Sequence, residues 1–142
     1  MNIIDEVKKL NLPIGSYAVF GSGPMQVRKI KPFNKDIDLI VTPQLYEQMK
    51  SAGWDEKFWD EGTRYLVKGI LEVCDTWDYP PYHPDVAKLI KQAEVIEGVP
   101  FVQLEEVLKY KKAYNRPKDQ VDAKLIEDYL SSQLPQPHSP AA

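Results

Sequence analysis

The sequence has few of the residues that build disulfide frameworks or zinc sites. Its 142 residues include one cysteine, Cys74, and two histidines, His83 and His138. A single cysteine cannot form an intramolecular disulfide, and sparse cysteine is typical of proteins that stay inside the cell. These three residues also fall short of the ligand set of a structural zinc ion. We therefore expect a cytoplasmic protein whose stability depends on its own hydrophobic core.

Long apolar runs and a strong net charge are also absent. No stretch is long and apolar enough to cross a bilayer as a helix, and the N-terminal MNIIDEVKKL is charged where a signal peptide is apolar. The formal net charge is −3, from 18 Lys and Arg against 21 Asp and Glu. Such a balance gives no overall attraction to DNA or to an anionic membrane. We expect neither as a partner.

The rest of the composition fits one globular domain. Hydrophobic residues make up 43% of the chain and charged residues 27%, which is ordinary for a protein with a buried core. Residues 132–142 are rich in proline and polar side chains, a composition that predicts a disordered tail. We therefore expect a single domain over residues 1–131, followed by that tail.

Apolar periodicity and turn residues predict a mixture of helices and strands. Strands are expected at 16–20, 36–41, 63–67, 70–75 and 99–102, and helices at 3–10, 24–30, 43–52, 84–94, 104–115 and 117–130. The segment 54–62 is expected to be a loop. This order predicts an α/β (α+β) fold with a small mixed sheet of about three to five strands, flanked by helices and followed by C-terminal helices.

Acidic residues stand inside two of the predicted strands. Asp36 and Asp38 alternate with apolar residues in the stretch DIDLIV. Alternate strand residues share a face, so the two carboxylates project together and repel unless a cation lies between them. The later strand at 70–75 offers Glu72, between apolar neighbours, or Asp75, at its end, as a third acid. Carboxylate oxygens of this kind suit Mg²⁺.

A glycine turn follows the first predicted strand. Gly21-Ser22-Gly23 leads from that strand into a predicted helix. Such a turn presents backbone N–H groups and a helix N-terminus to phosphate, and Ser22 adds a hydroxyl. Gln26 stands where both the Walker A and the dinucleotide-binding patterns require a glycine. The turn therefore predicts phosphate binding outside those two classes.

In this order, the segments resemble the signature of the polymerase-β-like nucleotidyltransferase superfamily. In that signature a hydrophobic strand ends in Gly-Ser, as at Val19-Phe-Gly-Ser, and the next strand reads as DIDLIV does. A third acid then stands between apolar residues, which favours Glu72 over Asp75. The stretch from Leu104 to Asp122 is similar to the helical end of the minimal members, with its Lys and its Arg-Pro-Lys-Asp. The resemblance spans residues 15 to 130, approximately.

The resemblance implies a palm-like fold and a reaction. A nucleoside monophosphate would pass from an NTP, such as ATP, to a hydroxyl of a small molecule, a protein or RNA, and pyrophosphate would leave. Asp36, Asp38 and Glu72 would be the catalytic acids and would bind two Mg²⁺ ions, with Mn²⁺ as a substitute.

The resemblance also implies the nucleotide-binding residues. Gly21 and Ser22 would hold the β- and γ-phosphates. Lys111 would reach the triphosphate or balance the acids. It continues an apolar helical face, so a buried stem with a charged tip at the surface is the alternative.

The sequence also allows other interpretations of its basic and aromatic residues and of its function. The basic residues around Lys111 fit a solvated helix face or one that approaches RNA or phosphate; they are Lys109, Lys112, Arg116 and Lys118. Trp77, Tyr79 and Tyr82 fit either loop packing or stacking on a base. For the whole chain, the alternative function is a catalytically silent nucleotide-binding or protein-interaction module, such as a toxin–antitoxin component.

Overall fold

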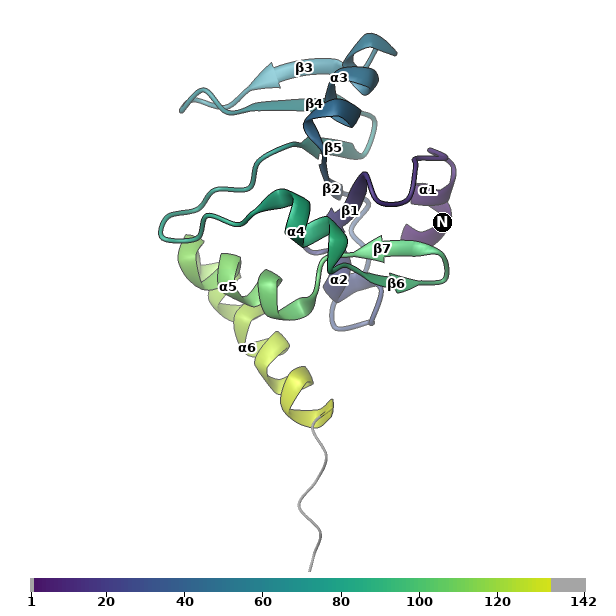
Figure 1. Ribbon diagram of the computed structural model, residues 1–142. Helices are drawn as coiled ribbons and strands as arrows, with labels where there is room; N and C mark the ends of the chain where they lie inside the picture. The colour runs from purple at the N-terminus through teal and green to yellow at the C-terminus, as the bar shows by residue number, and fades with distance from the viewer. Residues whose placement is uncertain (1, 134–142) are drawn as a thin grey trace, which may run out of the picture.

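The computed structural model describes residues 2–133, in which helices are interspersed among the strands (Figure 1). The helices are α1 (Ile3–Lys8), α2 (Gly23–Gln26), α3 (Pro43–Ser51), α4 (Val86–Lys91), α5 (Leu104–Tyr114) and α6 (Pro117–Gln133). The strands are β1 (Tyr17–Phe20), β2 (Ile37–Val41), β3 (Asp55–Phe58), β4 (Arg64–Lys68), β5 (Leu71–Cys74), β6 (Glu94–Ile96) and β7 (Val99–Phe101).

The strands form one mixed sheet in the order β3-β4-β5-β2-β1-β7-β6. β2 pairs with β5, and β1 with β7, in parallel, whereas the other neighbours are antiparallel. The predicted α/β (α+β) class, with a mixed sheet and C-terminal helices, is confirmed. The expected number of three to five strands is wrong, because the sheet has seven.

The two missed strands lie at the two edges of the sheet. β3 falls in the segment 54–62 that the sequence predicts as loop, and its four residues are mostly exposed. β6 begins at Glu94, where the sequence predicts the end of a helix, but α4 ends at Lys91. Edge strands are held by backbone pairing on one side and often carry polar side chains. Such strands lack the apolar alternation from which a strand is predicted.

Several predicted boundaries shift in the structure. α2 ends at Gln26 and not near residue 30, and β2 begins at Ile37, so Asp36 precedes the strand. The predicted cap of α3 is confirmed, because the Thr42 side chain accepts a hydrogen bond from the N–H of Leu45. Of the predicted tail at 132–142, residues 132 and 133 belong to α6, and residues 134–142 lie outside the described part of the chain.

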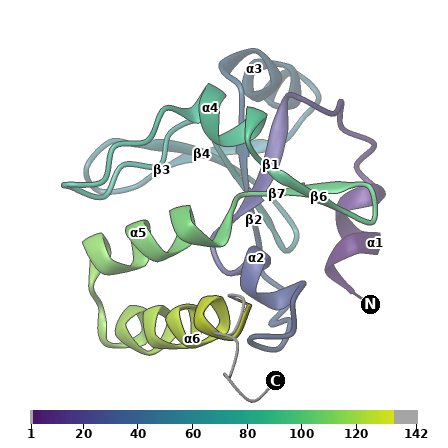
Figure 2. The same ribbon diagram turned by 60° about the horizontal axis from the view of Figure 1, so that its bottom comes forward.

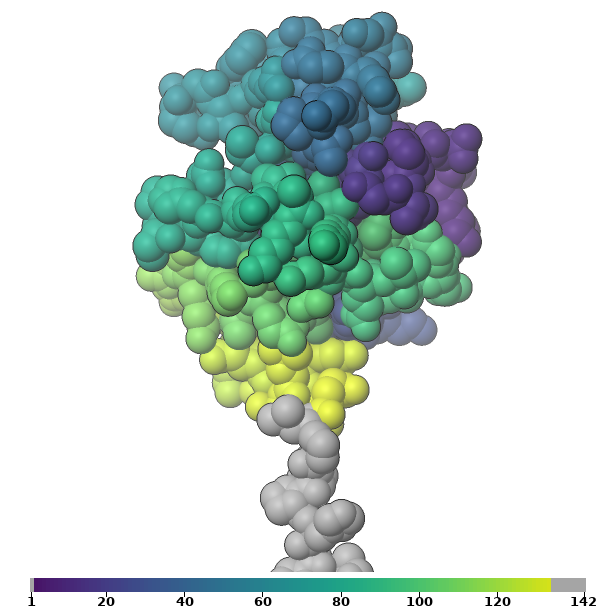
Figure 3. All heavy atoms as spheres, in the orientation of Figure 1, coloured from purple at the N-terminus to yellow at the C-terminus, as the bar shows by residue number. Residues whose placement is uncertain are grey.

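Both faces of the sheet are covered by helices. On one face, α1 and α3 pack on strand residues such as Val19, Leu39 and Val73. On the other, α2, α4, α5 and α6 pack on the alternate strand residues, among them Phe20 and Ile40. Figure 3 shows α6 at one end of the molecule and α3 with the β3–β4 hairpin at the other. The second face is the one on which the acid of β2 lies.

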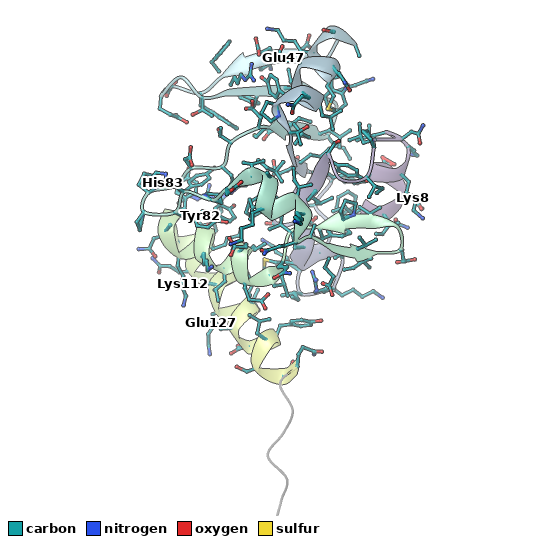
Figure 4. The ribbon with its side chains drawn as sticks, in the orientation of Figure 1. Lys8, Glu47, Tyr82, His83, Lys112 and Glu127 are labelled. Carbon is teal, nitrogen blue, oxygen red and sulfur yellow. The ribbon has the colours of Figure 1, made fainter. Side chains whose placement is uncertain are left out.

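A sharp corner folds α6 back along α5 (Figure 2). Asn115 takes a left-handed conformation with φ of 58° and ends α5, and Pro117 begins α6. Lys112 and Glu127, labelled in Figure 4, form an exposed ion pair of 3.1 Å between the two helices. Within residues 2–133, no helix has the length and apolarity needed to span a membrane.

The two-sided core predicts different costs for the same substitution in two strands. Val73 in β5 is completely buried, whereas Val95 in β6 is 59% exposed. We expect Val73→Ala to lower the free energy of unfolding by about 2–3 kcal/mol, because it removes buried methyl groups and leaves a cavity. Val95→Ala is the matched control and should change it by less than about 0.5 kcal/mol. Urea denaturation measures both, and equal costs would contradict the described packing.

Candidate active site

Two strands bring two acids side by side. β2 and β5 pair in parallel with Asp38 directly opposite Glu72. Asp38 alternates with Leu39, which is buried on the α1–α3 face, so Asp38 lies on the face covered by α5. Ile40, two residues on, belongs to the core of that second face. The predicted strand alternation therefore holds for Asp38.

The pairing of the two acids is electrostatically unfavourable. Burial, the charge of Glu72, a hydrogen bond with Glu72 and the charge of Asp36 raise the pKa of Asp38 to about 7, and Lys111 opposes the shift. A nearby carboxylate raises the pKa of Asp38 because like charges disfavour its ionised form. A divalent cation between them would remove this repulsion. The donor set, carboxylate oxygens from adjacent strands, fits Mg²⁺.

Asp36 lies just outside the strand on which the sequence placed it. Its backbone N–H donates to Asn34 Oδ1 at 3.1 Å, and that oxygen also accepts from Gln26 Nε2 at 3.0 Å. The loop held in this way ends where β2 begins, so Asp36 is exposed while Asp38 is partly buried. Both line the same cavity. Among residues 2–133, no three Asp, Glu, His or Cys side chains are already gathered as a metal-binding group.

Gly21 is required by the approach of β1 to Asp38. Its φ is +60°, a conformation that glycine adopts without strain. A Cβ at this position would overlap Asp38 Oδ2. The Gly-Ser turn therefore lies directly against the acid of β2. Ser22 follows in the turn and lines the cavity.

Lys111 projects from α5 into the opposite side of this site. Its side chain is 3% exposed, and Nζ lies 2.9 Å from Asp122 Oδ2 and 3.7 Å from Asp119 Oδ1. Nζ also donates to Ser22 Oγ at 3.4 Å. The ammonium is therefore buried between the C-terminal helix and the glycine turn. The alternative of a surface-reaching lysine tip does not describe this residue.

Asp119 and Asp122 belong to the stretch that resembles the minimal members, but the sequence alone assigned no role to either. Both lie three residues apart on α6 and are buried. Asp119 accepts from the side chain of Arg116 at 2.7 and 3.1 Å, and although burial opposes its ionisation, these bonds lower its pKa. Lys31 Nζ lies 3.0 and 3.1 Å from the two oxygens of Asp122. The signal available in the sequence was their i, i+3 spacing, which places both on one helical face within the stretch similar to the minimal members. Ala123, next to Asp122, is buried as well.

The predicted basic run divides between solvent and the cavity. Lys109 and Lys112 form exposed ion pairs with Glu106 and Glu127. Lys111, Arg116 and Lys118 line the cavity. The interpretation as a solvated helix face thus fits part of the run only.

Asp75, the competing third acid, points elsewhere. Its carboxylate pairs with Arg64 at 2.6 Å, and Arg64 also pairs with Glu47 of α3 at 2.7 Å. Asp75 is not among the residues that line the cavity, whereas Glu72 is. The structure therefore brings Glu72, and not Asp75, to Asp38.

The acids and cations share one cavity of about 570 Å³. Aromatic side chains line it as well, namely Trp59, Trp77, Tyr79, Tyr110 and Tyr114. Trp77 is buried and stacks on Phe20 with ring centroids 4.5 Å apart, so loop packing accounts for it. Tyr82 donates to Glu106 and does not line the cavity. Burial and the nearby acids raise the pKa of Cys74, which keeps its thiol protonated.

We expect Gly21→Ala to destabilise the protein more than Gly69→Ala. The two glycines have the same left-handed backbone, with φ of +60° and +59°. An added Cβ has open space at Gly69 but overlaps Asp38 at Gly21. Gly69→Ala therefore isolates the backbone cost, about 1–2 kcal/mol, and Gly21→Ala adds the displacement of Asp38. Urea denaturation in the presence of a chelator measures the difference, and equal costs would contradict this close approach.

We also expect Asp38→Asn to stabilise the metal-free protein. At pH 8 the substitution removes a charge that burial and Glu72 both disfavour, so the free energy of unfolding should rise by about 1 kcal/mol or more. Asp128→Asn is the control, because Asp128 is exposed and forms an ion pair with Lys124. Thermal and urea unfolding with a chelator present measure the effect. A loss of stability in Asp38→Asn would refute the described repulsion.

Comparison with known proteins rests on solved structures. No protein-family profile and no curated protein matches this sequence. The solution structure of the antibiotic-resistance factor ANT(2'')-Ia aligns with a TM-score of 0.52 at 17% identity, covering 92% of this chain and 82% of that one. The crystal structure of ANT(2'')-Ia in complex with adenylyl-2''-tobramycin aligns with a TM-score of 0.50 at 17% identity, covering 93% and 87%.

At this identity the alignment concerns the fold alone. It extends over nearly the whole described chain and includes the sheet and the C-terminal helices. The protein therefore shares its fold with ANT(2'')-Ia.

Proposed function

We propose that the protein is a metal-dependent nucleotidyltransferase, which transfers a nucleoside monophosphate from an NTP to a hydroxyl and releases pyrophosphate. The observation that carries this proposal is the pairing of Asp38 with Glu72 opposite the buried Lys111 and the Gly-Ser turn, all around one cavity. Acids that suit a metal and cations that suit phosphate are the equipment of phosphoryl-type transfer. The shared fold with a protein solved in complex with adenylyl-2''-tobramycin supports it.

The acids have distinct roles in this proposal. Asp36, Asp38 and Glu72 hold the catalytic Mg²⁺, for which Mn²⁺ is a substitute. When bound, the metal neutralises charge on the triphosphate and on the departing pyrophosphate. The raised pKa of Asp38 means that its ionised form is disfavoured, and a bound cation would stabilise that form. Glu72, directly opposite Asp38 on the neighbouring strand, is our candidate to receive the proton of the acceptor hydroxyl.

The remaining residues hold the triphosphate. Gly21 and Ser22 bind the β- and γ-phosphates through backbone N–H groups and the Ser22 hydroxyl, and Lys111 supplies positive charge. The acceptor oxygen attacks the α-phosphorus and forms a new P–O bond. The bond from the α-phosphorus to the bridging oxygen of the β-phosphate breaks, and its electron pair leaves with pyrophosphate. The hydroxyl proton passes to Glu72.

The acceptor is a hydroxyl compound that enters the same cavity. The residues that line the cavity include Trp59 and Tyr79 together with the exposed acids Glu61 and Asp78. Aromatic faces and carboxylates favour a hydroxylated ligand with positive charge. A small molecule of that kind is therefore our first acceptor class, ahead of protein or RNA.

The test is transfer of label from each α-labelled NTP, with Mg²⁺ or Mn²⁺, to hydroxylated amines and to cell extract. We expect labelled product and released pyrophosphate. Asp36→Ala and Asp38→Ala should abolish transfer, and Glu72→Gln should lower kcat by about a hundredfold or more. Removing the metal with a chelator should stop the reaction in the wild type.

Asp75→Asn is the matched control for Glu72→Gln. Asp75 is close to the same strand but pairs with Arg64 outside the cavity, so this variant should keep kcat within about threefold while losing some stability. Equal activity of the Asp38→Ala variant and the wild type would refute the proposal. NTP binding without pyrophosphate release, or a stable protein partner without NTP binding, would favour the catalytically silent module instead.

A further inference from the structure

Five charged side chains form a partly buried network beside the Gly-Ser turn. They are Lys31, Lys111, Arg116, Asp119 and Asp122, and the network joins the loop after α2 to α5 and α6. The two aspartates are buried, with 0% and 4% of their surfaces exposed. Buried charges persist only when they are paired and hydrogen-bonded. The five side chains therefore form a defined, mutually paired cluster, and its arrangement depends on both α5 and α6.

Asp122 is the hub of the network. Its two oxygens accept from Lys31 at 3.1 and 3.0 Å, and Oδ2 also accepts from Lys111 at 2.9 Å. One carboxylate thus holds two ammonium groups that come from different segments. Asp119 lies farther from Lys111, at 3.7 Å, and is occupied by Arg116. Without Asp122, neither lysine has an equivalent partner in the described part of the chain.

The positive charges of the network face the cavity. Lys31, Lys111 and Arg116 all line it, together with Asp122 and Ser22. Lys31 is 28% exposed, so its ammonium is accessible to a ligand while Asp122 holds it. Three cations against two carboxylates leave an excess of positive charge on this wall. Such a wall, next to a hydroxyl and a glycine turn, suits a chain of phosphates.

We propose that Lys31 is a second phosphate-binding lysine of this site and that Asp122 is a positioning residue, which holds Lys31 and Lys111 together against the phosphate chain. The inference rests on the proposed function for its substrate, and it adds two residues to which the sequence alone assigned no role. Asp122 acts through the lysines and does not touch phosphate itself. Its negative charge offsets part of the positive charge of the two lysines that it holds in place.

The test uses inorganic tripolyphosphate as a probe, so that it does not depend on catalysis. Calorimetric titration of the full chain should show binding. Lys31→Gln should weaken it about tenfold, and Asp122→Asn at least about tenfold, because each removes or releases a charge-assisted contact. Lys29→Gln, an exposed lysine two residues from Lys31 that does not line the cavity, and Asp128→Asn, an exposed acid of α6, are the matched controls and should bind as the wild type does.

The double variant separates positioning from simple charge. If Asp122 acts by holding Lys31, then Lys31→Gln combined with Asp122→Asn should bind no more than about threefold more weakly than Asp122→Asn alone. Additive losses, or unchanged or tighter binding in Asp122→Asn, would overturn the positioning role. If circular dichroism shows that Asp122→Asn does not fold, Lys31→Gln becomes the test. Wild-type binding of tripolyphosphate by Lys31→Gln would then overturn the proposal.

The tripolyphosphate-binding result and the test of nucleotidyl transfer can each fail without the other. Tripolyphosphate binding that depends on Lys31 and Asp122, without nucleotidyl transfer by the wild type, would refute the enzyme and keep the phosphate wall. Transfer by the wild type, with an unchanged KM for NTP in Lys31→Gln and Asp122→Asn, would keep the enzyme and refute the phosphate wall. When both hold, the variants should raise KM for NTP about tenfold while kcat changes less.

Discussion

The site depends on the parallel pairing of β2 with β5, which sets two carboxylates directly opposite each other. Nothing in the packing requires an acid at either position, and the pair costs stability in the absence of a cation. Around this pair the chain relieves the repulsion only in part. Gly21 approaches Asp38 without a side chain, and Lys111, whose charge opposes the pKa shift of Asp38, is paired with Asp122. Strain of this kind is expected at functional sites and is offset by the core elsewhere.

The two walls of the cavity come from opposite halves of the chain. The acids stand on the central strands, which are formed by residues 37–41 and 71–74, whereas the cations come mainly from α5 and the start of α6. The sheet fixes the acids through regular backbone pairing. The helices have no such register, and they are held by apolar packing on the sheet, by the corner at Asn115 and by the buried ion pairs. The acids and the cations thus reach the cavity through different kinds of structure.

Much of the site could be predicted because strand alternation and glycine turns are local. DIDLIV indicated which face Asp38 occupies, and the turn indicated where β1 ends. Strand pairing is not local, so the residues alone left Glu72 and Asp75 as alternatives; the register of β5 against β2 separates them. The edge strands β3 and β6 were missed because their side chains are mostly exposed and carry no apolar period. Lys31 had no signal, because its partner lies 91 residues away.

The position of α6 also bears on when the site is completed during synthesis. Chains emerge from the ribosome N-terminus first, so β1, β2 and β5 are available while α6 is still being made. The strands that carry the acids are therefore synthesised before Asp122, which holds the lysines. Until α6 is synthesised, Lys111 lacks its buried partners Asp119 and Asp122, although the apolar residues of α5 can already pack on the sheet. The acidic side of the cavity thus precedes the cation-holding residues of α6 in the order of synthesis, and the cavity is complete only when α6 is in place.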